Sequence, residues 1–169
     1  LFTGASGFLG YNVLPLLKKK YSVETIGLTS QDDYIVNLAA EIPKLAGKYD
    51  VILHVAGKAH SLPKTEAEKR LFFDVNLQGT KNLCTALEQS GIPKSFIFIS
   101  TVAVYGCDSG ENITEEYPLN GTTPYALSKI KAEKYLEEWC AMHNVKLSIL
   151  RPSLIAGPNP PGNLGAMIH

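Results

Sequence analysis

The chain has 169 residues, 45% of them hydrophobic and 19% charged, and its formal net charge at neutral pH is zero. This composition is typical of one globular domain that buries a sizeable core. A balanced charge argues against nucleic acid or an anionic membrane as the main partner, and no apolar run approaches the roughly 18 residues that a membrane-spanning helix needs.

Cysteine and histidine usage argues against a metal site. The three cysteines, Cys84, Cys107 and Cys140, lack the spacing of metal ligands. The four histidines form no HExxH-type pattern. Free thiols are typical of a reducing compartment, so we expect a cytoplasmic protein without a bound metal.

Short apolar runs rich in β-branched residues alternate with longer helical patterns along the chain. Uniformly apolar strands separated by helices indicate a parallel sheet with both faces covered, and right-handed crossovers then give a doubly wound, Rossmann-like α/β fold. We expect residues 1–169 to form a dinucleotide-binding domain, truncated at both ends, without the substrate-binding C-terminal region of a larger two-part enzyme. The predicted strands are residues 1–3, 23–28, 34–38, 51–55, 96–100 and 146–150, and the predicted helices are residues 8–19, 39–46, 65–90 and 124–143.

A glycine-rich turn, TGASGFLG at residues 3–10, joins the first predicted strand to the first helix. Glycine permits a tight turn and lets backbone N–H groups approach a pyrophosphate at the helix N-terminus. The spacing is GxxGxxG rather than the GxGxxG of the standard dinucleotide fingerprint. Its position between a strand and an apolar helix is what favours dinucleotide binding over a plain connection.

The end of the second predicted strand bears on the choice of cofactor. The usual fingerprint has an acid about 20 residues after the glycines, which binds the ribose 2′-hydroxyl. Here Thr29 and Ser30 follow the strand, and the first acids are Asp32 and Asp33. No Lys or Arg occurs between residues 21 and 43, so a 2′-phosphate would lack a cation. We expect NAD, and NADP stays open because the hydroxyls could serve either cofactor.

Tyr125 and Lys129 are four residues apart, so they share one face of the last predicted helix. A nearby ammonium lowers the pKa of a phenol, and a bound oxidised nicotinamide adds further positive charge. Such a tyrosine can exchange a proton with a hydroxyl group. Thr101 ends a predicted strand, where ligands bind in doubly wound sheets. Alone, the Tyr–Lys spacing is also typical of an ordinary amphipathic helix.

Together these segments resemble the extended short-chain dehydrogenases/reductases, in particular the NAD-dependent epimerase/dehydratase family of nucleotide-sugar enzymes. The resemblance covers essentially the whole chain. It is carried by residues 3–10 (TGASGFLG), 50–56 (DVILHVA), 75–82 (VNLQGTKN), 98–106 (FISTVAVYG), 124–129 (PYALSK) and 150–158 (LRPSLIAGP).

The resemblance implies a role for each matching position. Thr101, Tyr125 and Lys129 would be the catalytic residues. Asn37 replaces an acid that usually touches adenine, and Arg151-Pro152 would lead to the nicotinamide amide and the substrate. The residues implied to bind or support the cofactor are Gly4, Ser6, Gly7, Phe8, Leu9, Gly10, Thr29, Asn37, Leu38, Val55, Ala56, Gly57, Asn76, Tyr125, Lys129 and Pro152.

Two departures from the family patterns narrow the expected reaction. Nucleotide-sugar 4,6-dehydratases carry Asp-Glu directly after the active-site threonine, whereas Val102-Ala103 stands here, so dehydration is disfavoured. Many 4-epimerases have Asn at the position of Leu154, and leucine is similar to reductase-type members.

We therefore expect an enzyme that acts on a sugar hydroxyl, at C4 of a nucleoside-diphosphate sugar, as a 4-epimerase or a 4-reductase. The resemblance also allows a homodimer. Two alternatives stay open: a reductase of a non-sugar ketone, and a dinucleotide-binding sensor without chemistry.

Overall fold

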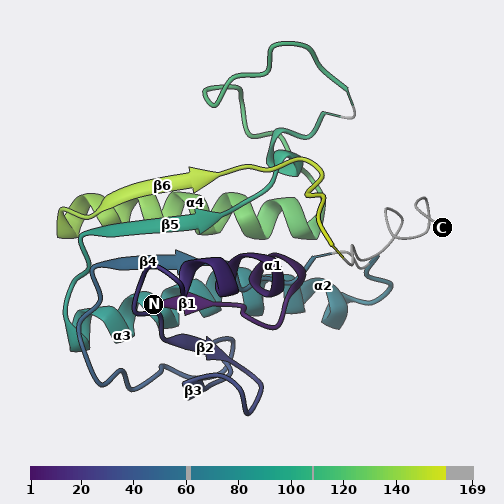
Figure 1. Cartoon of the computed structure of the whole chain (residues 1–169). Coiled ribbons are helices and arrows are strands. Elements are labelled where there is room, and N and C mark those ends of the chain that lie inside the picture. The colour runs from purple at the N-terminus through teal and green to yellow at the C-terminus, as the bar shows by residue number, and fades with distance from the viewer. Residues whose placement is uncertain (60–61, 108, 159–169) are drawn as a thin grey trace.

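The computed structural model describes residues 1–59, 62–107 and 109–158; residues 159–169 of the predicted domain lie outside them. Within this part, six parallel strands form one sheet in the order β3-β2-β1-β4-β5-β6 (Figure 1). The order reverses between β1 and β4, and open α/β sheets bind their ligands at such a switch point. The strands are β1 Phe2–Thr3, β2 Thr25–Gly27, β3 Tyr34–Ile35, β4 Val51–His54, β5 Ser95–Ile99 and β6 Lys146–Leu150.

The helices cover both faces of the sheet. Figure 1 shows α1 in front of the sheet and α3 and α4 behind it. The doubly wound α/β fold expected from the sequence is therefore confirmed. The helical elements are α1 Phe8–Leu17, α2 Glu66–Phe73, the π-helix η1 Asp74–Gln78, α3 Gly79–Ser90, the 3₁₀ turn η2 Val102–Tyr105 and α4 Pro124–His143.

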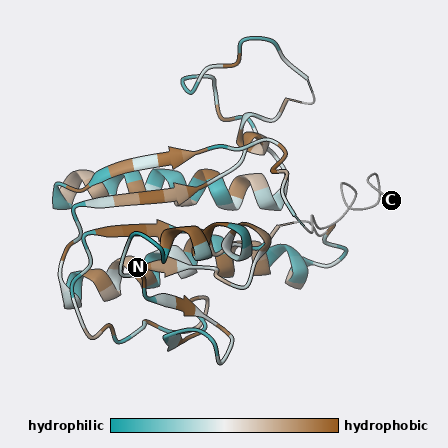
Figure 2. Ribbon diagram, viewed as in Figure 1, coloured by the Kyte–Doolittle hydropathy of each residue, from teal (hydrophilic) through white to brown (hydrophobic). Residues whose placement is uncertain are grey.

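The main hydrophobic core lies between the sheet and the pair α3 and α4. Alternate residues of β4 and β5 point into it, because side chains alternate between the two faces of a strand. Figure 2 shows hydrophobic colour along β4, β5 and β6. This packing fixes the strand ends that carry the candidate site. The core residues include Ile52, Leu83, Leu87, Phe96, Phe98, Leu136 and Trp139, none more than 3% exposed.

The segment predicted as one helix over residues 65–90 is helical but interrupted. It begins with a capping box, in which the Thr65 hydroxyl accepts a bond from the Glu68 amide and the Glu68 carboxylate accepts one from the Thr65 amide. The π-helix η1 then separates α2 from α3. Hydrophobic periodicity does not reveal such a bulge, and bulges of this kind are frequent at functional sites.

The helix predicted over residues 39–46 is wrong. Asn37 starts a turn there, accepting backbone bonds from Ala40 and Glu41, and no helix follows. Pro43 has no backbone donor, which disfavours a helix interior. The second and third predicted strands are also shorter than expected, since β2 covers Thr25–Gly27 and β3 covers Tyr34–Ile35. The Asp33 carboxylate, just before β3, accepts bonds from the Thr25 amide and hydroxyl.

Candidate functional site

A cleft of about 630 Å³ opens at the carboxyl ends of the strands, around the switch point between β1 and β4. Its volume is in the range of small-molecule and cofactor sites. It brings together residues from all six segments that carry the family resemblance. The sequence-predicted residues that line it are Gly4, Ser6, Gly7, Phe8, Leu9, Asn37, Leu38, Val55, Ala56, Gly57, Thr101, Tyr125 and Pro152.

Glycine is required at two positions of the turn between β1 and α1. Gly4 has a φ of +80°, and a Cβ there would stand 2.6 Å from the Ala56 amide nitrogen. A Cβ on Gly10 would stand 2.3 Å from the Gly4 carbonyl oxygen. Both contacts are with backbone, which cannot swing aside. A side chain at Gly4 would therefore push the turn away from the loop after β4, and one at Gly10 would clash within the turn itself, against Gly4 and Ala5.

Gly7 plays a different part in this turn. It is the N-cap of α1, no side chain caps the helix, and a Cβ would meet only the Gly4 carbonyl, at 3.4 Å. The first amides of α1 thus lack a side-chain acceptor beside the cleft. Uncapped amides at a helix N-terminus attract anions. This geometry fits the pyrophosphate of a dinucleotide.

An acid lies behind the end of β2 although none follows it directly in sequence. The Asp32 Oδ2 atom accepts bonds from the Thr29 hydroxyl at 2.7 Å and the Thr29 amide at 3.1 Å. It lies so close to Gly27 that a Cβ there would meet it at 2.3 Å. Gly27 and Leu28 line the cleft. Thr29 is not among the lining residues, and its hydroxyl donates a hydrogen bond to Asp32.

Asn76 braces the site from the π-helix η1. Its side-chain carbonyl accepts a bond from the Lys58 amide at 2.7 Å. Its amide group donates to the Lys58 carbonyl at 3.0 Å and to the Ser128 hydroxyl at 2.9 Å. One buried side chain thus ties the loop after β4 to α4. The proposed supporting role of Asn76 has a matching geometry, although the residue itself does not line the cleft.

Lys129 is buried behind the cleft, with 4% of its surface exposed. Its ammonium donates to the Ile99 carbonyl at 2.8 Å and lies 4.5 Å from the centre of the Phe98 ring. A Cβ on Gly57 would stand 3.1 Å from Nζ and 3.2 Å from the Asn76 side-chain oxygen, so a larger residue there would press on both. Burial lowers the pKa of Lys129 to about 8, an effect that the nearby Glu133 carboxylate opposes.

Tyr125 lines the cleft near Thr101, as the sequence predicted, but its acidity differs from expectation. Burial raises the pKa of the Tyr125 phenol above its usual value, and the Thr101 hydroxyl opposes that rise only in part. We expected the Lys129 ammonium to lower it. In the protein alone that expectation is wrong, because the ammonium is directed at the Ile99 carbonyl and desolvation dominates.

A chain of hydrogen bonds through His54 links the glycine-rich turn to η1. Thr80 donates to the Asn76 carbonyl at 2.7 Å, so its oxygen accepts from His54 Nε2 at 2.9 Å. His54 Nδ1 then accepts from the Thr3 hydroxyl at 2.6 Å, and that hydroxyl accepts from the Ala56 amide at 3.1 Å. Burial lowers the pKa of His54 to about 3, so the ring is neutral. Sequence reasoning missed this network because its members are distant along the chain.

Arg151 does not point toward the cleft. Although Pro152 lines it, the Arg151 guanidinium turns toward Glu133 on α4. Ser128 and Glu133 were also missed as site neighbours. Their signal was present, since Ser128 lies within the PYALSK segment and Glu133 continues the four-residue spacing of Tyr125 and Lys129.

The described part of the chain was searched for a metal site and for a membrane-spanning helix. No cluster of His, Cys, Asp and Glu there has a geometry that could hold a metal ion. None of the described helices combines the length and apolar character that a membrane crossing requires.

A six-stranded parallel sheet, a glycine cradle at a helix N-terminus and a Tyr–Thr pair in one cleft define a dinucleotide-binding α/β domain. The family is then shown by comparison. Residues 1–169 match the model of the NAD dependent epimerase/dehydratase family, and the chain belongs to that family.

Curated relatives are similar over nearly the whole chain. The N-acetyl-alpha-D-glucosaminyl-diphospho-ditrans,octacis-undecaprenol 4-epimerase of Escherichia coli O157:H7 is 33% identical over 97% of this chain and 51% of its own length. The UDP-glucose 4-epimerase of Vibrio cholerae is 30% identical over 100% of this chain and 55% of its own length. The chain thus spans about half the length of the curated relatives it matches.

Solved structures agree on the fold. The crystal structure of the Thermus thermophilus UDP-glucose 4-epimerase in complex with NAD superposes with a TM-score of 0.79 at 26% identity, covering 99% of this chain and 59% of that one. Other relatives are named as a dTDP-D-glucose 4,6-dehydratase and a GDP-6-deoxy-D-mannose reductase. The family therefore includes several sugar-modifying reactions.

Proposed function

We propose that the protein carrying this chain binds NAD and acts on the C4 hydroxyl of a nucleoside-diphosphate sugar. The observation that carries the proposal is that one cleft is lined both by the glycine cradle of α1 and by Tyr125 and Thr101. The named activities of the relatives support the substrate class.

Each proposed catalytic residue has a distinct task. When bound, NAD supplies the site that accepts or returns a hydride. Tyr125 exchanges a proton with the sugar hydroxyl, and Thr101 hydrogen-bonds the same oxygen. Lys129 supplies positive charge behind them, and its three donor hydrogens leave it able to bond the nicotinamide ribose besides the Ile99 carbonyl.

The end of β2 favours NAD over NADP. The Thr29 hydroxyl donates to Asp32, so it can only accept a bond from a ribose hydroxyl. A 2′-phosphate has no hydrogen to give there, and it would face the buried Asp32 carboxylate. The negative charges of the 2′-phosphate and the Asp32 carboxylate would repel each other, so the loop after β2 discriminates against NADP.

The residues after β5 and β6 narrow the reaction to epimerisation or reduction. Val102 and Ala103 follow Thr101 and offer neither an acid nor a base for eliminating water. Leu154 lines the cleft, and an aliphatic side chain there favours the second candidate, a 4-reductase. A homodimer and a cytoplasmic location remain part of the proposal.

The test uses the full-length protein with UDP-glucose or UDP-N-acetylglucosamine and with NAD or NADPH. Interconversion of the sugars without net cofactor turnover would identify an epimerase, and net turnover a reductase or dehydrogenase. A folded protein that binds NAD but turns over none of a broad panel of nucleotide sugars would overturn the proposal. Sedimentation of the same sample measures the oligomeric state.

A further inference from the structure

A buried ion pair lies one helical turn behind Lys129. Glu133 on α4 is completely buried, and the Arg151 side chain is 13% exposed. Arg151 donates from Nε to Oε1 at 3.2 Å and from Nη2 to Oε2 at 2.8 Å, a two-pronged contact. Such bidentate pairs fix geometry as well as charge.

The same carboxylate holds the end of β5. The Ser100 hydroxyl donates to Glu133 Oε1. Ser100 stands between Ile99, whose carbonyl accepts the Lys129 ammonium, and Thr101. Glu133 therefore binds Ser100, the residue between Ile99, which holds the Lys129 ammonium, and Thr101, which carries the proposed substrate-binding hydroxyl.

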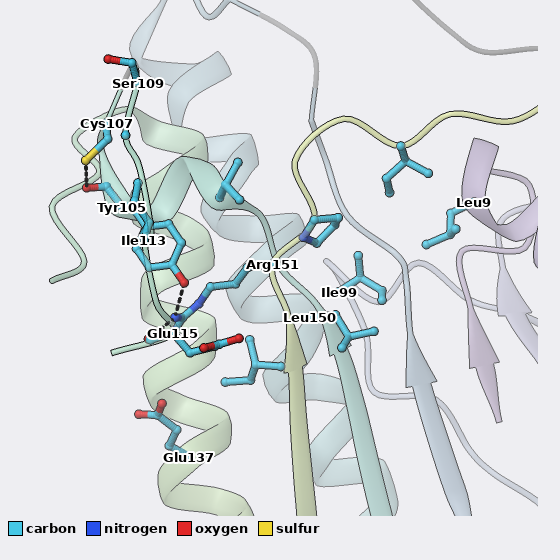
Figure 3. Close-up of a pocket in the computed structure, with 15 residues that line it drawn as sticks. Leu9, Ile99, Tyr105, Cys107, Ser109, Ile113, Glu115, Glu137, Leu150 and Arg151 are labelled. Carbon is cyan, nitrogen blue, oxygen red and sulfur yellow. Dashed lines mark hydrogen bonds between the residues drawn. The ribbon is translucent and has the colours of Figure 1, made fainter. Parts of the chain in front are cut away.

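Arg151 is itself held from the far side. Its Nη1 atom donates to the Tyr105 hydroxyl at 3.0 Å and to the Glu115 carbonyl at 2.8 Å. Figure 3 shows Arg151 at the end of β6 reaching toward Tyr105 and Glu115. The guanidinium is thus oriented from both ends, and Glu133 is oriented by it.

Stability alone is a poor reason for this arrangement. Replacing a buried ion pair by well-packed hydrophobic residues is often neutral or stabilising, because the charges lose their hydration. The pair instead adjoins two groups of the proposed site, which suggests a role in placing them.

We propose that Glu133 is a positioning residue for the proton-transfer site, holding Ser100 so that Thr101 and the Ile99 carbonyl stay in place, and supplying a fixed negative charge behind Lys129. This inference rests on the proposed function of Tyr125, Thr101 and Lys129. Glu133 touches no substrate in this scheme and acts through its neighbours.

The surroundings of Lys129 leave Glu133 as the anion that opposes its desolvation. Burial lowers the pKa of Lys129, and Glu133 raises it. The His54 ring on β4 is neutral, and the Lys58 ammonium lies 5.5 Å from the centre of the Phe72 ring. Glu133 on α4 and the His54 ring on β4 act on Lys129 electrostatically. Tyr125 lies one turn before Lys129 on α4, Arg151 pairs with Glu133, and Lys58 follows Gly57, whose Cβ would stand 3.1 Å from Lys129 Nζ.

The experiment titrates Lys129 directly in the full-length protein. The ¹³Cε chemical shift of each lysine is followed against pH by NMR, and the Lys129 signal is assigned by its loss in Lys129→Met. In Glu133→Gln we expect the Lys129 midpoint to fall by roughly one pH unit, and kcat with the sugar nucleotide to fall roughly 10–100-fold at a little-changed KM. The matched control is Glu137→Gln, the next turn of α4, where an exposed carboxylate is removed; neither value should move.

An unchanged Lys129 midpoint in folded Glu133→Gln would overturn the electrostatic half of the proposal, even if thermal stability fell. Because the titration needs no substrate, it stands whether or not the proposed reaction is right. Ser100→Ala keeps the ion pair and removes only the grip on β5. It should lower kcat at an unchanged Lys129 midpoint, and a wild-type kcat in this variant would overturn the positioning half.

Discussion

Tyr125 lies in the first turn of α4, with the centre of its ring 6.1 Å from that of Phe72. Tyr125→Phe keeps this packing and removes the transferable proton. We expect unchanged thermal stability and NAD affinity and a loss of turnover of roughly 10²–10⁴-fold, the usual contribution of a general acid–base group. Steady-state kinetics and calorimetric NAD titration measure both effects. Near-normal rates with the correct sugar nucleotide would mean that Tyr125 is not the proton carrier.

Lys129 offers a test in which stability and activity move in opposite directions. Its pKa falls from 10.5 to about 8 on burial, so the charged form is disfavoured by about 3 kcal/mol at the usual conversion. Lys129→Met removes that cost, although it also loses the bond to the Ile99 carbonyl. We expect a protein of equal or higher unfolding free energy that has lost turnover and binds NAD more weakly. Denaturant melts and NAD titration would show this, and full activity would rule out the assigned role.

The milder variant at the residue scale is Thr101→Val. It removes one hydrogen bond to the substrate oxygen and no proton carrier, so its loss of turnover should be smaller than that of Tyr125→Phe. The two rates are compared in the same assay, and a larger loss in Thr101→Val would reverse the assigned roles.

At the scale of elements, two glycine substitutions in the turn from β1 into α1 test stability and cofactor binding separately. Gly10→Ala places a Cβ 2.3 Å from the Gly4 carbonyl oxygen, so the backbone of the turn must shift. Overpacking of this kind lowers the free energy of unfolding by roughly 1–3 kcal/mol. Gly7→Ala meets only a 3.4 Å contact, so its fold should hold while the added methyl obstructs the α1 amides. We expect both variants to bind NAD weakly and only Gly10→Ala to be destabilised. If Gly7→Ala bound NAD normally, the cradle would be wrongly placed.

The helices and strands show where sequence reasoning succeeded and where it stopped. Pro124–His143 was predicted with the bounds that the structure has. Local features mark both ends of this helix, since Thr123 caps it, proline opens it and Asn144 closes it in the left-handed conformation. These signals are local. The helix predicted over residues 39–46 failed for two reasons. Pro43 is a local signal that the prediction overlooked, and the contact of the Ala46 amide with the Tyr34 hydroxyl depends on the fold around it. Asn76, within the π-helix, contacts Lys58 and Ser128, which are distant in sequence.

For the site, contiguous motifs were predictable and assembled contacts were not. The glycine-rich turn and the Tyr–Lys pair are each visible within a few residues of sequence. Asp32 returning to Thr29, and Arg151 reaching Glu133, depend on how the loops and strand ends meet. The expectation for the Tyr125 pKa failed for the same reason, because burial and the direction of an ammonium are tertiary properties.

At the scale of the whole molecule, His54 makes the fold sensitive to acid. Its pKa is about 3 in the folded protein and about 6.5 in the unfolded chain. Above pH 6.5 neither form binds the proton, and the neutral ring contributes its full stability. As pH falls below 6.5, the unfolded chain takes up a proton that the folded protein cannot, so unfolding becomes easier by about 1.4 kcal/mol per pH unit down to pH 3.

Urea melts between pH 7 and pH 4 measure this slope. His54→Gln does not titrate, so the difference between its pH dependence and that of the wild type isolates the histidine. We expect His54→Gln to be less stable at pH 7 but to lose less stability on acidification. Parallel slopes for the two proteins would show that His54 is protonated in the folded state.

In the proposed scheme, the strand order β3-β2-β1-β4-β5-β6 places cofactor selection and proton transfer at the ends of different strands. Thr29 and Asp32 follow β2, whereas Thr101 follows β5, and β1 and β4 lie between them. Coenzyme preference can then drift during evolution, or be redesigned, without disturbing proton transfer. Asp32→Asn should relax the preference for NAD, Thr101→Val should slow turnover, and the double variant should show the product of both effects, within roughly 0.5 kcal/mol of additivity. A larger deviation would show that the two ends of the cleft are energetically coupled.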